Sequence, residues 1–352
     1  MKQYRNILVN SLVNLGDVLL TTSAIALLRK QYPKARITML VRPVVREAVE
    51  NNPVIDDVIL FAYQARKNSF RKMWDMVQEL RQRHFDLAIS FDRKLRPALL
   101  CWLAGIPERV CPERVFDDIP SRVTWFYTKV IPIQHDLDTT LQAETYQAII
   151  RGFTGCTGQE APVMARILPA HEKKAAALLA EAPSNARRIV FCVKGTFPLK
   201  TWPKEYFARL ADSLAQQPTA FFIVGAPGDW EYAEEVIAGM HQPVVNLCGA
   251  TSLMELAALF HQIDLLVTVD TGATHIAATT GVPMVVMYGC TSPQRWHPIN
   301  ENARVLTSSE PCCPCHYRAE ECPSHPRPAC LWKVTPEMVW EKCQELLAGR
   351  QL

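Results

Sequence analysis

Short apolar runs alternate with segments of helical spacing along this chain, and this alternation restricts its fold more than any other feature. Runs such as NILVN (6–10) and ARITMLV (35–41) are each followed by a segment whose apolar residues recur every three or four positions. The same order begins again at RRIVFCV (187–193). Strand–helix alternation favours a parallel sheet with helices on both faces. We therefore predict an α/β chain made of two doubly wound, Rossmann-like domains.

The two series are separated by residues 154–170, where turn-forming residues occur without a sustained period. This stretch is predicted to be a linker, because 352 residues with 49% hydrophobic side chains are enough for two separate cores. We assign residues 1–165 to an N-terminal domain and residues 166–334 to a C-terminal domain. A final helix is predicted within 335–352, where a Thr-Pro pair suits its start and a glycine its end.

The sequence contains no predicted membrane segment. No apolar run reaches the ~18 residues that a spanning helix needs. The apolar stretch near the N-terminus is interrupted by Asn10, Asn14 and Asp17, so we do not predict a signal peptide. We expect a cytoplasmic protein.

Charge is distributed unevenly between the two halves. Residues 1–153 carry 22 Lys and Arg against 16 Asp and Glu, whereas the rest of the chain carries 16 against 19. A basic half suits an anionic partner, although an ordinary solvated surface explains the same balance.

Polar residues at the ends of predicted strands are the candidates for a binding site, because doubly wound folds bind ligands at the carboxyl ends of their strands. In the first half, Gly16 and Asp17 lie between the strand at 6–10 and the next helix. An acid at this place either favours the helix start or acts as a general base. The G-x-G-x-x-G dinucleotide fingerprint does not occur here.

Two loops of the second half carry groups suited to a nucleoside diphosphate. The loop VKGTFPLKTWP supplies Lys194, Thr196 and Lys200, which are two ammonium groups and a hydroxyl without the Walker spacing. The segment VGAPGDWE places Asp229 after a strand, where a carboxylate binds ribose hydroxyls in nucleotide folds. Each loop taken alone fits an ordinary charged surface equally well.

The segment VDTGATHIAATTGVP is the most unusual of these strand ends. Asp270, Thr271 and Gly272 open a helix whose free N–H groups suit a phosphate. His275 lies one turn later, on the same side as Thr271. Alanines in this helix permit a close approach of a ligand or another element.

Taken in order, LGDVLLTTSAIALLRKQYPKARITMLVRP, KGTFPLKTWP, VDTGATHIAATTGVPMVVMYGCTSP and the tail ending CLWKVTPEMVW resemble the bacterial heptosyltransferases, ADP-heptose:lipopolysaccharide enzymes of glycosyltransferase family 9. The resemblance spans nearly the whole chain. It implies a GT-B fold, in which two Rossmann-like domains face a central cleft and the last helix crosses back to the N-terminal domain. It also implies an inverting transfer of heptose from ADP-heptose to the lipopolysaccharide inner core or a related glycan, with no obligatory cofactor or metal.

The resemblance assigns roles to the candidate residues. Asp17 matches the family's catalytic acid residue in its Gly-Asp-Val motif and becomes the candidate base. The remaining matches form the expected donor site, made of Lys194, Thr196, Lys200, Asp229, Asp270, Thr271, Gly272 and His275.

The expected acceptor is an anionic, phosphorylated lipid at the cytoplasmic face of the inner membrane, so the protein is expected to be peripheral to that membrane and to bind no nucleic acid. Candidate acceptor-binding residues of the basic half are Arg42, Arg66, Arg93 and Arg96.

Five of the twelve cysteines crowd into residues 312–330. A zinc or iron–sulfur site made by Cys312, Cys315, Cys322 and Cys330 is one alternative, although the spacing of the second pair is too long for a C-x-x-C motif. A nucleotide-sugar epimerase of the same two-domain architecture and a nucleotide- or metal-binding sensor built on the Cys-rich tail remain the competing functions.

Overall fold

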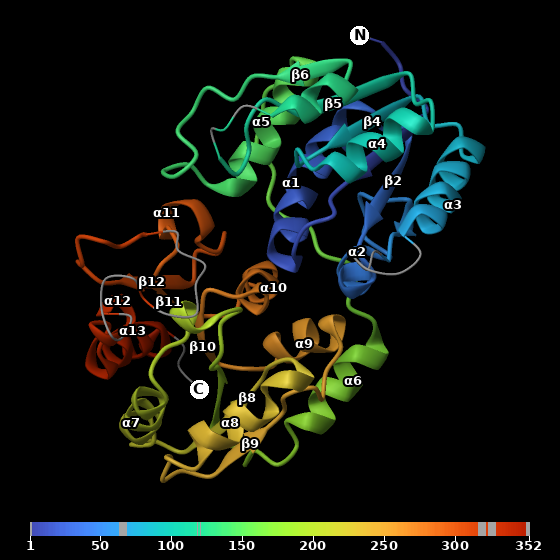
Figure 1. Cartoon of the computed structure of the whole chain (residues 1–352). Helices are drawn as coiled ribbons and strands as arrows, with labels where there is room; N and C mark the ends of the chain where they lie inside the picture. Colours follow the sequence, from blue (N-terminus) through green and yellow to red (C-terminus); the bar gives the residue numbers. More distant parts are fainter. Residues whose placement is uncertain are drawn as a thin grey trace. The chain divides into compact units, whose positions relative to one another are not determined.

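The computed structural model describes residues 2–62, 69–117, 119, 121–315, 322 and 329–349. The chain divides into two compact units, Met1–Arg166 and Ile167–Leu352, and each unit is built around one six-stranded parallel sheet (Figure 1).

The first sheet has the strand order β3-β2-β1-β4-β5-β6. Its strands are β1 (Asn6–Asn10), β2 (Arg36–Val41), β3 (Asp57–Leu60), β4 (Leu87–Ser90), β5 (Glu108–Pro112) and β6 (Lys129–Ile131). The order reverses between β1 and β4, which pair in parallel with Asn10 opposite Ser90. This reversal leaves room for a ligand at the carboxyl ends of the two strands.

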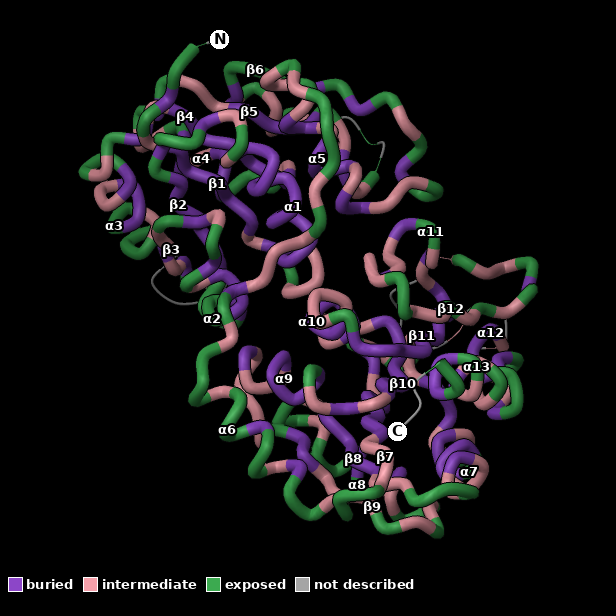
Figure 2. Tube along the Cα trace, turned by 180° about the vertical axis from the view of Figure 1, so that it is seen from behind, coloured by how far each residue is buried: buried purple, intermediate pink, exposed green. Residues whose placement is uncertain are grey.

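The α-helices of this unit that the structure describes are α1 (Leu15–Gln31), α2 (Arg46–Val49), α3 (Ser69–Gln82), α4 (Leu95–Leu103) and α5 (Gln142–Thr154). Helix α1 is buried from Val18 to Leu28 and packs along α5, so its small and aliphatic residues face protein on nearly every side. One core cluster joins the sheet to α3 and α4 through residues such as Leu40, Val77 and Leu100. The two helices differ in burial: α1 is mostly buried, whereas many residues of α3 are exposed (Figure 2).

The second sheet has the order β12-β11-β10-β7-β8-β9. Its strands are β7 (Arg187–Cys192), β8 (Thr219–Ile223), β9 (Val244–Asn246), β10 (Leu265–Val269), β11 (Met284–Tyr288) and β12 (Ala303–Thr307). The helices of this unit are α6 (Pro169–Leu178), α7 (Lys204–Leu214), α8 (Trp230–Ile237), α9 (Leu253–Phe260), α10 (Gly272–Thr280), α11 (Pro293–Trp296), α12 (Ala329–Trp332) and α13 (Pro336–Ala348). Every residue of β10 and β11 is buried, as expected of parallel strands covered on both faces.

The last helix, α13, begins where its sequence predicts. The hydroxyl of Thr335 accepts the N–H of Met338 at 3.4 Å, and Pro336 takes the first helical position. The helix belongs to the second unit and packs there against α7, β10 and β11. Its predicted crossing to the N-terminal domain stays a prediction.

Several elements were not predicted from the sequence. They include the strands β5, β6 and β12 and the helices α6, α11 and α12. Among the described residues, no helix combines the length and the hydropathy that a bilayer crossing requires.

Candidate active site

The carboxyl ends of β7, β10 and β11 converge on one buried carboxylate in the second unit. Lys200, from the loop after β7, places its Nζ 2.5 Å from Oδ2 of Asp270, which follows β10. Thr291, which follows β11, donates its hydroxyl to the same oxygen at 2.6 Å. The side chains of Lys200 and Asp270 are only 15% and 7% exposed, so their attraction is weakly screened by water.

Two glycines allow the backbone to bring Lys200 to this position. Lys200 ends the short 3₁₀ helix η3 (Pro198–Lys200). A Cβ on Gly195 would lie 2.5 Å from the Cβ of Lys200, and one on Gly289 would lie 2.9 Å from the carbonyl oxygen of Leu199. No side chain fits in either contact, so η3 is held between the ends of β7 and β11 by backbone packing.

The start of α10 lies directly after Asp270. Thr271 is its N-cap, with a hydroxyl that accepts the N–H of Ala273 at 3.2 Å. Gly272 is the first helical residue, and the following N–H groups carry the partial positive charge of a helix N-terminus. This end of the helix can therefore bind an anion beside the Lys200–Asp270 pair.

His275 is buried on α10, with 6% of its surface exposed. Burial, together with the nearby charges of Lys200 and His297, lowers the pKa of its imidazole to about 4 against the opposing effect of Asp270. The ring is therefore neutral at physiological pH. It can donate one hydrogen bond and accept another, which suits a sugar hydroxyl better than it suits a phosphate.

Lys194 and Asp229 form a second pair in the same unit. Their Nζ and Oδ1 atoms are 2.9 Å apart. The other oxygen of Asp229 accepts the N–H of Ala226 at 2.9 Å, which fixes the turn after β8. A Cβ on Gly225 would lie 3.2 Å from that oxygen, so the glycine gives the carboxylate its room. Thr196, the remaining donor-site candidate, lies on the exposed part of the same loop as Lys194.

In the first unit, Asp17 lies within the first turn of α1 rather than in a loop before it, since α1 begins at Leu15. The hydroxyl of Tyr146 donates to Oδ1 of Asp17 at 2.8 Å. Tyr146 is fully buried on α5, where it also packs edge-on against Phe91. The carboxylate of Asp17 is thus oriented by a rigid aromatic side chain. No motif in the sequence indicated Tyr146 or Thr291 for these contacts.

The candidate acceptor-binding arginines differ in their surroundings. The guanidinium of Arg93 donates to the carbonyl oxygens of Glu113 and Ile119 at 2.7 and 2.8 Å and pairs with Asp117 at 2.5 Å. Its side chain is only 8% exposed, so it holds the loop after β5 and offers little to an anionic ligand.

Two other members of that set lie at the surface. Arg42 is exposed at the end of β2 and donates to the side chain of Asn14 at 3.5 Å. Arg96 is exposed in the first turn of α4. Arg66 lies outside the described residues.

The described part of the Cys-rich tail packs against the second sheet. The thiol of Cys313 donates to the carbonyl oxygen of Gly289 at 2.8 Å, and Cys330 is buried in the core of the second unit. Across the residues that the structure describes, no three His, Cys, Asp or Glu side chains are grouped so that they could hold a metal ion. The alternative ligand set of Cys312, Cys315, Cys322 and Cys330 stays untested beyond that.

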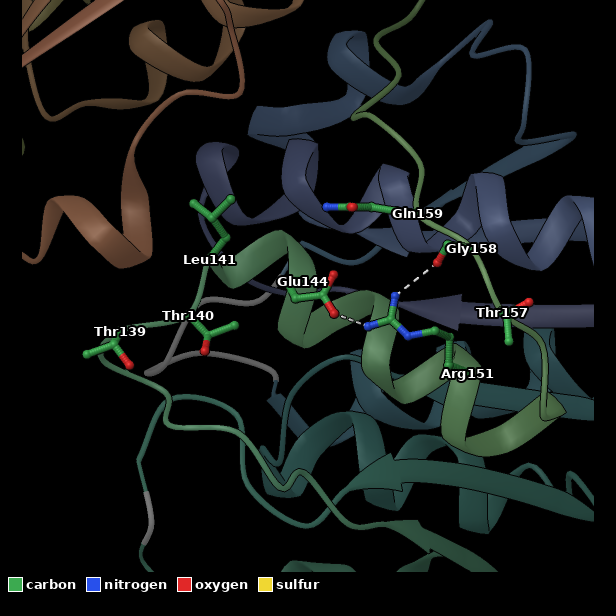
Figure 3. A pocket seen from close by; sticks show the side chains of 8 residues that line it. All are labelled: Thr139, Thr140, Leu141, Glu144, Arg151, Thr157, Gly158 and Gln159. Carbon is green, nitrogen blue, oxygen red and sulfur yellow. Dashed lines mark hydrogen bonds and ion pairs between the residues drawn. The ribbon is translucent and has the colours of Figure 1, made fainter.

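One pocket of the first unit, with a volume of about 670 Å³, lies between the start of α5 and residues 157–159 (Figure 3). Arg151 is one of its lining residues and lies between Glu144, with which it is paired, and Gly158, to whose carbonyl oxygen it donates at 3.1 Å. None of the candidate site residues lines this pocket.

Comparison with known proteins gives consistent matches. The model of glycosyltransferase family 9 (heptosyltransferase) matches residues 73–325. Lipooligosaccharide heptosyltransferase 2 of Haemophilus influenzae is 26% identical over 97% of this chain and 99% of that protein. Lipopolysaccharide heptosyltransferase 2 of Escherichia coli is 24% identical over 83% of this chain and 84% of that protein.

Solved structures share the fold. A family 9 glycosyltransferase from Veillonella parvula superposes with a TM-score of 0.85 at 24% identity, covering 99% of this chain and 98% of that one. The ADP-heptose lipopolysaccharide heptosyltransferase II of Escherichia coli gives 0.80 at 21%, covering 98% and 99%. These matches confirm the predicted α/β architecture of the GT-B class, with two Rossmann-like units.

Proposed function

The chain belongs to glycosyltransferase family 9, the heptosyltransferases, and from this premise we propose that it transfers heptose from ADP-heptose to the lipopolysaccharide inner core or a closely related glycan. Two relatives that match over most of the chain carry heptosyltransferase names, and one solved structure of similar fold is described as an ADP-heptose lipopolysaccharide heptosyltransferase. The observation that carries the proposal is the convergence of Lys200, Asp270 and Thr291 beside the start of α10.

This group of residues suits the diphosphate of the donor. An ammonium group has three donors, and Asp270 takes one of those of Lys200. The remaining donors, the hydroxyl of Thr196 and the first N–H groups of α10 supply positive potential to a diphosphate. His275, as a neutral ring, is assigned to the heptose, and Asp229 to the ribose.

We assign the general base to Asp17. Its carboxylate removes the proton of the acceptor hydroxyl while that oxygen forms a bond to the anomeric carbon. The bond from that carbon to the ADP oxygen breaks, and its electron pair leaves with the diphosphate, so the configuration at carbon inverts. Lys200 and the helix start stabilise the negative charge that develops on ADP, and the mechanism needs no obligatory metal.

The acceptor is proposed to meet the basic first unit. Arg42 and Arg96 are exposed there and are the described candidates for phosphate groups of a lipid-borne acceptor. Such an acceptor would bring the enzyme to the inner face of the cytoplasmic membrane as a peripheral protein.

ADP release from ADP-heptose, measured with and without a truncated core acceptor, tests this function. We expect release that depends on the acceptor in the wild type and that falls by about 10²- to 10⁴-fold in Asp17→Asn, the range typical of a lost general base. The affinity for ADP-heptose should stay unchanged in this variant. Turnover of the donor sugar without any acceptor would instead favour an epimerase, and a variant that keeps wild-type turnover would remove Asp17 from the mechanism.

A further inference from the structure

Exposed apolar side chains gather on the first unit. Among the described residues, eight of the twelve large apolar side chains that are exposed belong to this unit. Three of the eight are Trp74, Trp102 and Trp125, with 43%, 50% and 81% of their surface exposed. An indole ring left in water forgoes the burial of a large apolar area, so three of them on one unit indicate a partner that covers them.

The three tryptophans lie on neighbouring elements. Trp74 belongs to α3, Trp102 to the last turn of α4, and Trp125 to the 3₁₀ helix η2 (Arg122–Phe126). Helix α3 packs against α4, and α4 packs against η2. We call the exposed residues of these three elements the tryptophan face.

Side-chain contacts hold the tryptophan face together. The guanidinium of Arg81 lies over the ring of Trp74, 5.6 Å from its centroid. The same guanidinium donates at 2.7 Å to the carbonyl oxygen of Leu103, the last residue of α4. On the other side of α4, the ring of Trp102 packs edge-on against Phe126 of η2, with their centroids 5.7 Å apart. The aromatic side chains of the three elements therefore have fixed places next to one another.

Helix α4 carries apolar residues on two sides. Leu100 and Cys101 are buried in the core cluster of the first sheet. Leu95, Leu99 and Trp102 follow one another at intervals of four and three residues, so they form a stripe on one side of the helix, where Leu95 is exposed and Leu99 is half-buried. A surface helix of a globular protein normally turns polar residues outward. The stripe therefore indicates an apolar environment outside the fold.

The charge of the tryptophan face is positive. Helices α3 and α4 and η2 contain two acidic residues, Asp75 and Glu79. Against these they contain five exposed basic residues, Arg71, Lys72, Arg81, Arg96 and Arg122. An anionic partner complements this balance.

We propose that the tryptophan face docks on the surface of an anionic lipid bilayer, with the indole rings at the level of the headgroups and the basic side chains on the lipid phosphates. Aromatic rings and Lys or Arg side chains are the combination that bilayer interfaces favour, because each has an apolar body and a polar end. A protein partner fits less well, since charged residues are depleted from the core of protein interfaces. The proposal deepens the proposed function and rests on it for the choice of occupant, because an acceptor anchored in a bilayer requires the enzyme to reach that bilayer.

Docking is tested on vesicles that contain no acceptor. We expect the wild-type protein to co-sediment with vesicles of phosphatidylcholine and phosphatidylglycerol, and to bind more weakly to phosphatidylcholine alone. Arg71→Gln with Lys72→Gln should weaken binding to the anionic vesicles about 10- to 30-fold, because each basic residue near such a surface contributes about a factor of five. The matched control is Lys173→Gln with Lys174→Gln, an exposed basic pair on α6 of the second unit, which should leave binding unchanged.

The tryptophans have a readout of their own. Lipids with bromine in their acyl chains quench an indole that enters the bilayer, so wild-type fluorescence should fall on binding. The combined variant Trp74→Gln, Trp102→Gln and Trp125→Gln should lose this quenching and bind about tenfold or more weakly. Trp125→Gln alone changes the most exposed of the three side chains and should reduce the quenching without altering the urea unfolding curve. Trp230→Gln, at an exposed position of the second unit, should change neither signal.

Two results would overturn the docking proposal. One is wild-type affinity and quenching in both the Trp and the Arg71–Lys72 variants. The other is a concentration-dependent dimer of the wild type that the Trp variants lose while their vesicle binding is unchanged, since the face would then be an interface between copies of this chain.

Failure of the proposed function gives a different pattern. Vesicle binding through this face without any acceptor-dependent release of ADP would leave the surface in place and remove the function. If both proposals hold, the combined Trp variant should keep wild-type kcat on a truncated acceptor in solution and lose about tenfold or more of its rate on the same core carried by vesicles. Equal rates of variant and wild type on the vesicle-borne acceptor would contradict a role for docking in transfer.

Discussion

The ammonium group of Lys200 lies 2.5 Å from the same oxygen of Asp270 that accepts the hydroxyl of Thr291 at 2.6 Å. Three loops that follow three neighbouring strands thus meet at one buried oxygen. Buried ion pairs of this kind add little net stability compared with apolar residues, because both charges are desolvated. We explain the pair by its place beside the start of α10, where an oriented ammonium group suits the diphosphate of the proposed donor.

Removal of Lys200 tests this explanation. Lys200→Met leaves the carboxylate of Asp270 buried without its cation, so we expect the free energy of unfolding to fall by about 3–5 kcal/mol and ADP affinity to fall with it. Lys204→Met is the matched control, because its pair with Glu235 is exposed and should contribute at most about 1 kcal/mol. The double variant Lys200→Met with Asp270→Asn should recover stability in urea but not ADP affinity by calorimetry. Equal recovery of both would show that the pair is structural only.

The close packing at Gly195 predicts a selective effect of a single methyl group. The Cβ of Gly195→Ala would lie 2.6 Å from the carbonyl oxygen of Lys200, so η3 must shift. We expect kcat/KM for ADP-heptose to fall about 10- to 100-fold and stability to fall by about 1–3 kcal/mol. Gly228→Ala is the control, since no atom lies within 4 Å of its Cβ, and it should change stability by less than about 0.5 kcal/mol. Similar kinetics in the two variants would contradict a positioning role for the glycine.

Tyr146 is predicted to orient the base. In Tyr146→Phe the 2.8 Å hydrogen bond to Asp17 is lost while the ring still packs against Phe91. Hydrogen bonds to charged groups contribute about 1.5–3 kcal/mol, so we expect kcat to fall roughly ten- to a hundredfold with an unchanged KM for the donor. Tyr206→Phe, which removes a phenol bonded to the carbonyl of Trp332 in the other unit, should leave kcat near the wild-type value. A larger donor KM with normal kcat in Tyr146→Phe would place this tyrosine with the donor instead.

The buried imidazole of His275 predicts acid sensitivity of the second unit. Its folded-state pKa is lowered to about 4, while the unfolded chain takes up a proton near the ordinary value of 6.5. Stability is therefore complete above pH 6.5 and decreases as pH falls toward 4, by about 3 kcal/mol at 1.36 kcal/mol per pKa unit. Urea unfolding of His275→Gln between pH 7 and pH 4 should show a flatter dependence than the wild type. If the two proteins lose stability equally between pH 7 and pH 4, the pKa of His275 is not lowered in the folded protein.

Local sequence patterns were sufficient to predict the central elements of both units. The strand at 265–269 and the helix that follows it were found because a short aliphatic run ends in an N-cap, a glycine and small residues. The next helix upstream begins with a capping box, in which Ser252 and Glu255, three residues apart, exchange both hydrogen bonds. Such patterns do not predict β6 and β12, which are edge strands with largely exposed or half-buried residues. In these strands, packing against the neighbouring strand determines the conformation more than apolar content does.

The contacts within the site depend on topology and were less predictable. Lys200 and Asp270 are 70 residues apart in the chain, and only the placement of β7 beside β10 brings them together. The resemblance to the heptosyltransferases assigns both residues to one donor site but gives no distance between their side chains. Tyr146 carries no local motif at all, since a tyrosine within a helix is common in many proteins. Its significance arises from its burial and from the carboxylate of Asp17 that it meets.

The shared strand order of the two sheets places a carboxylate at the same point of each unit. In each sheet the order reverses beside the unit's first strand, between β1 and β4 in one and between β7 and β10 in the other. Asp92 and Asp270 therefore occupy corresponding places, each just after the fourth strand of its unit. Asp270 is paired there with the ammonium group of Lys200, whereas one oxygen of Asp92 accepts the N–H of Lys94 and the other is buried without a hydrogen bond. Two equivalent positions of one architecture thus differ in whether their charge is neutralised.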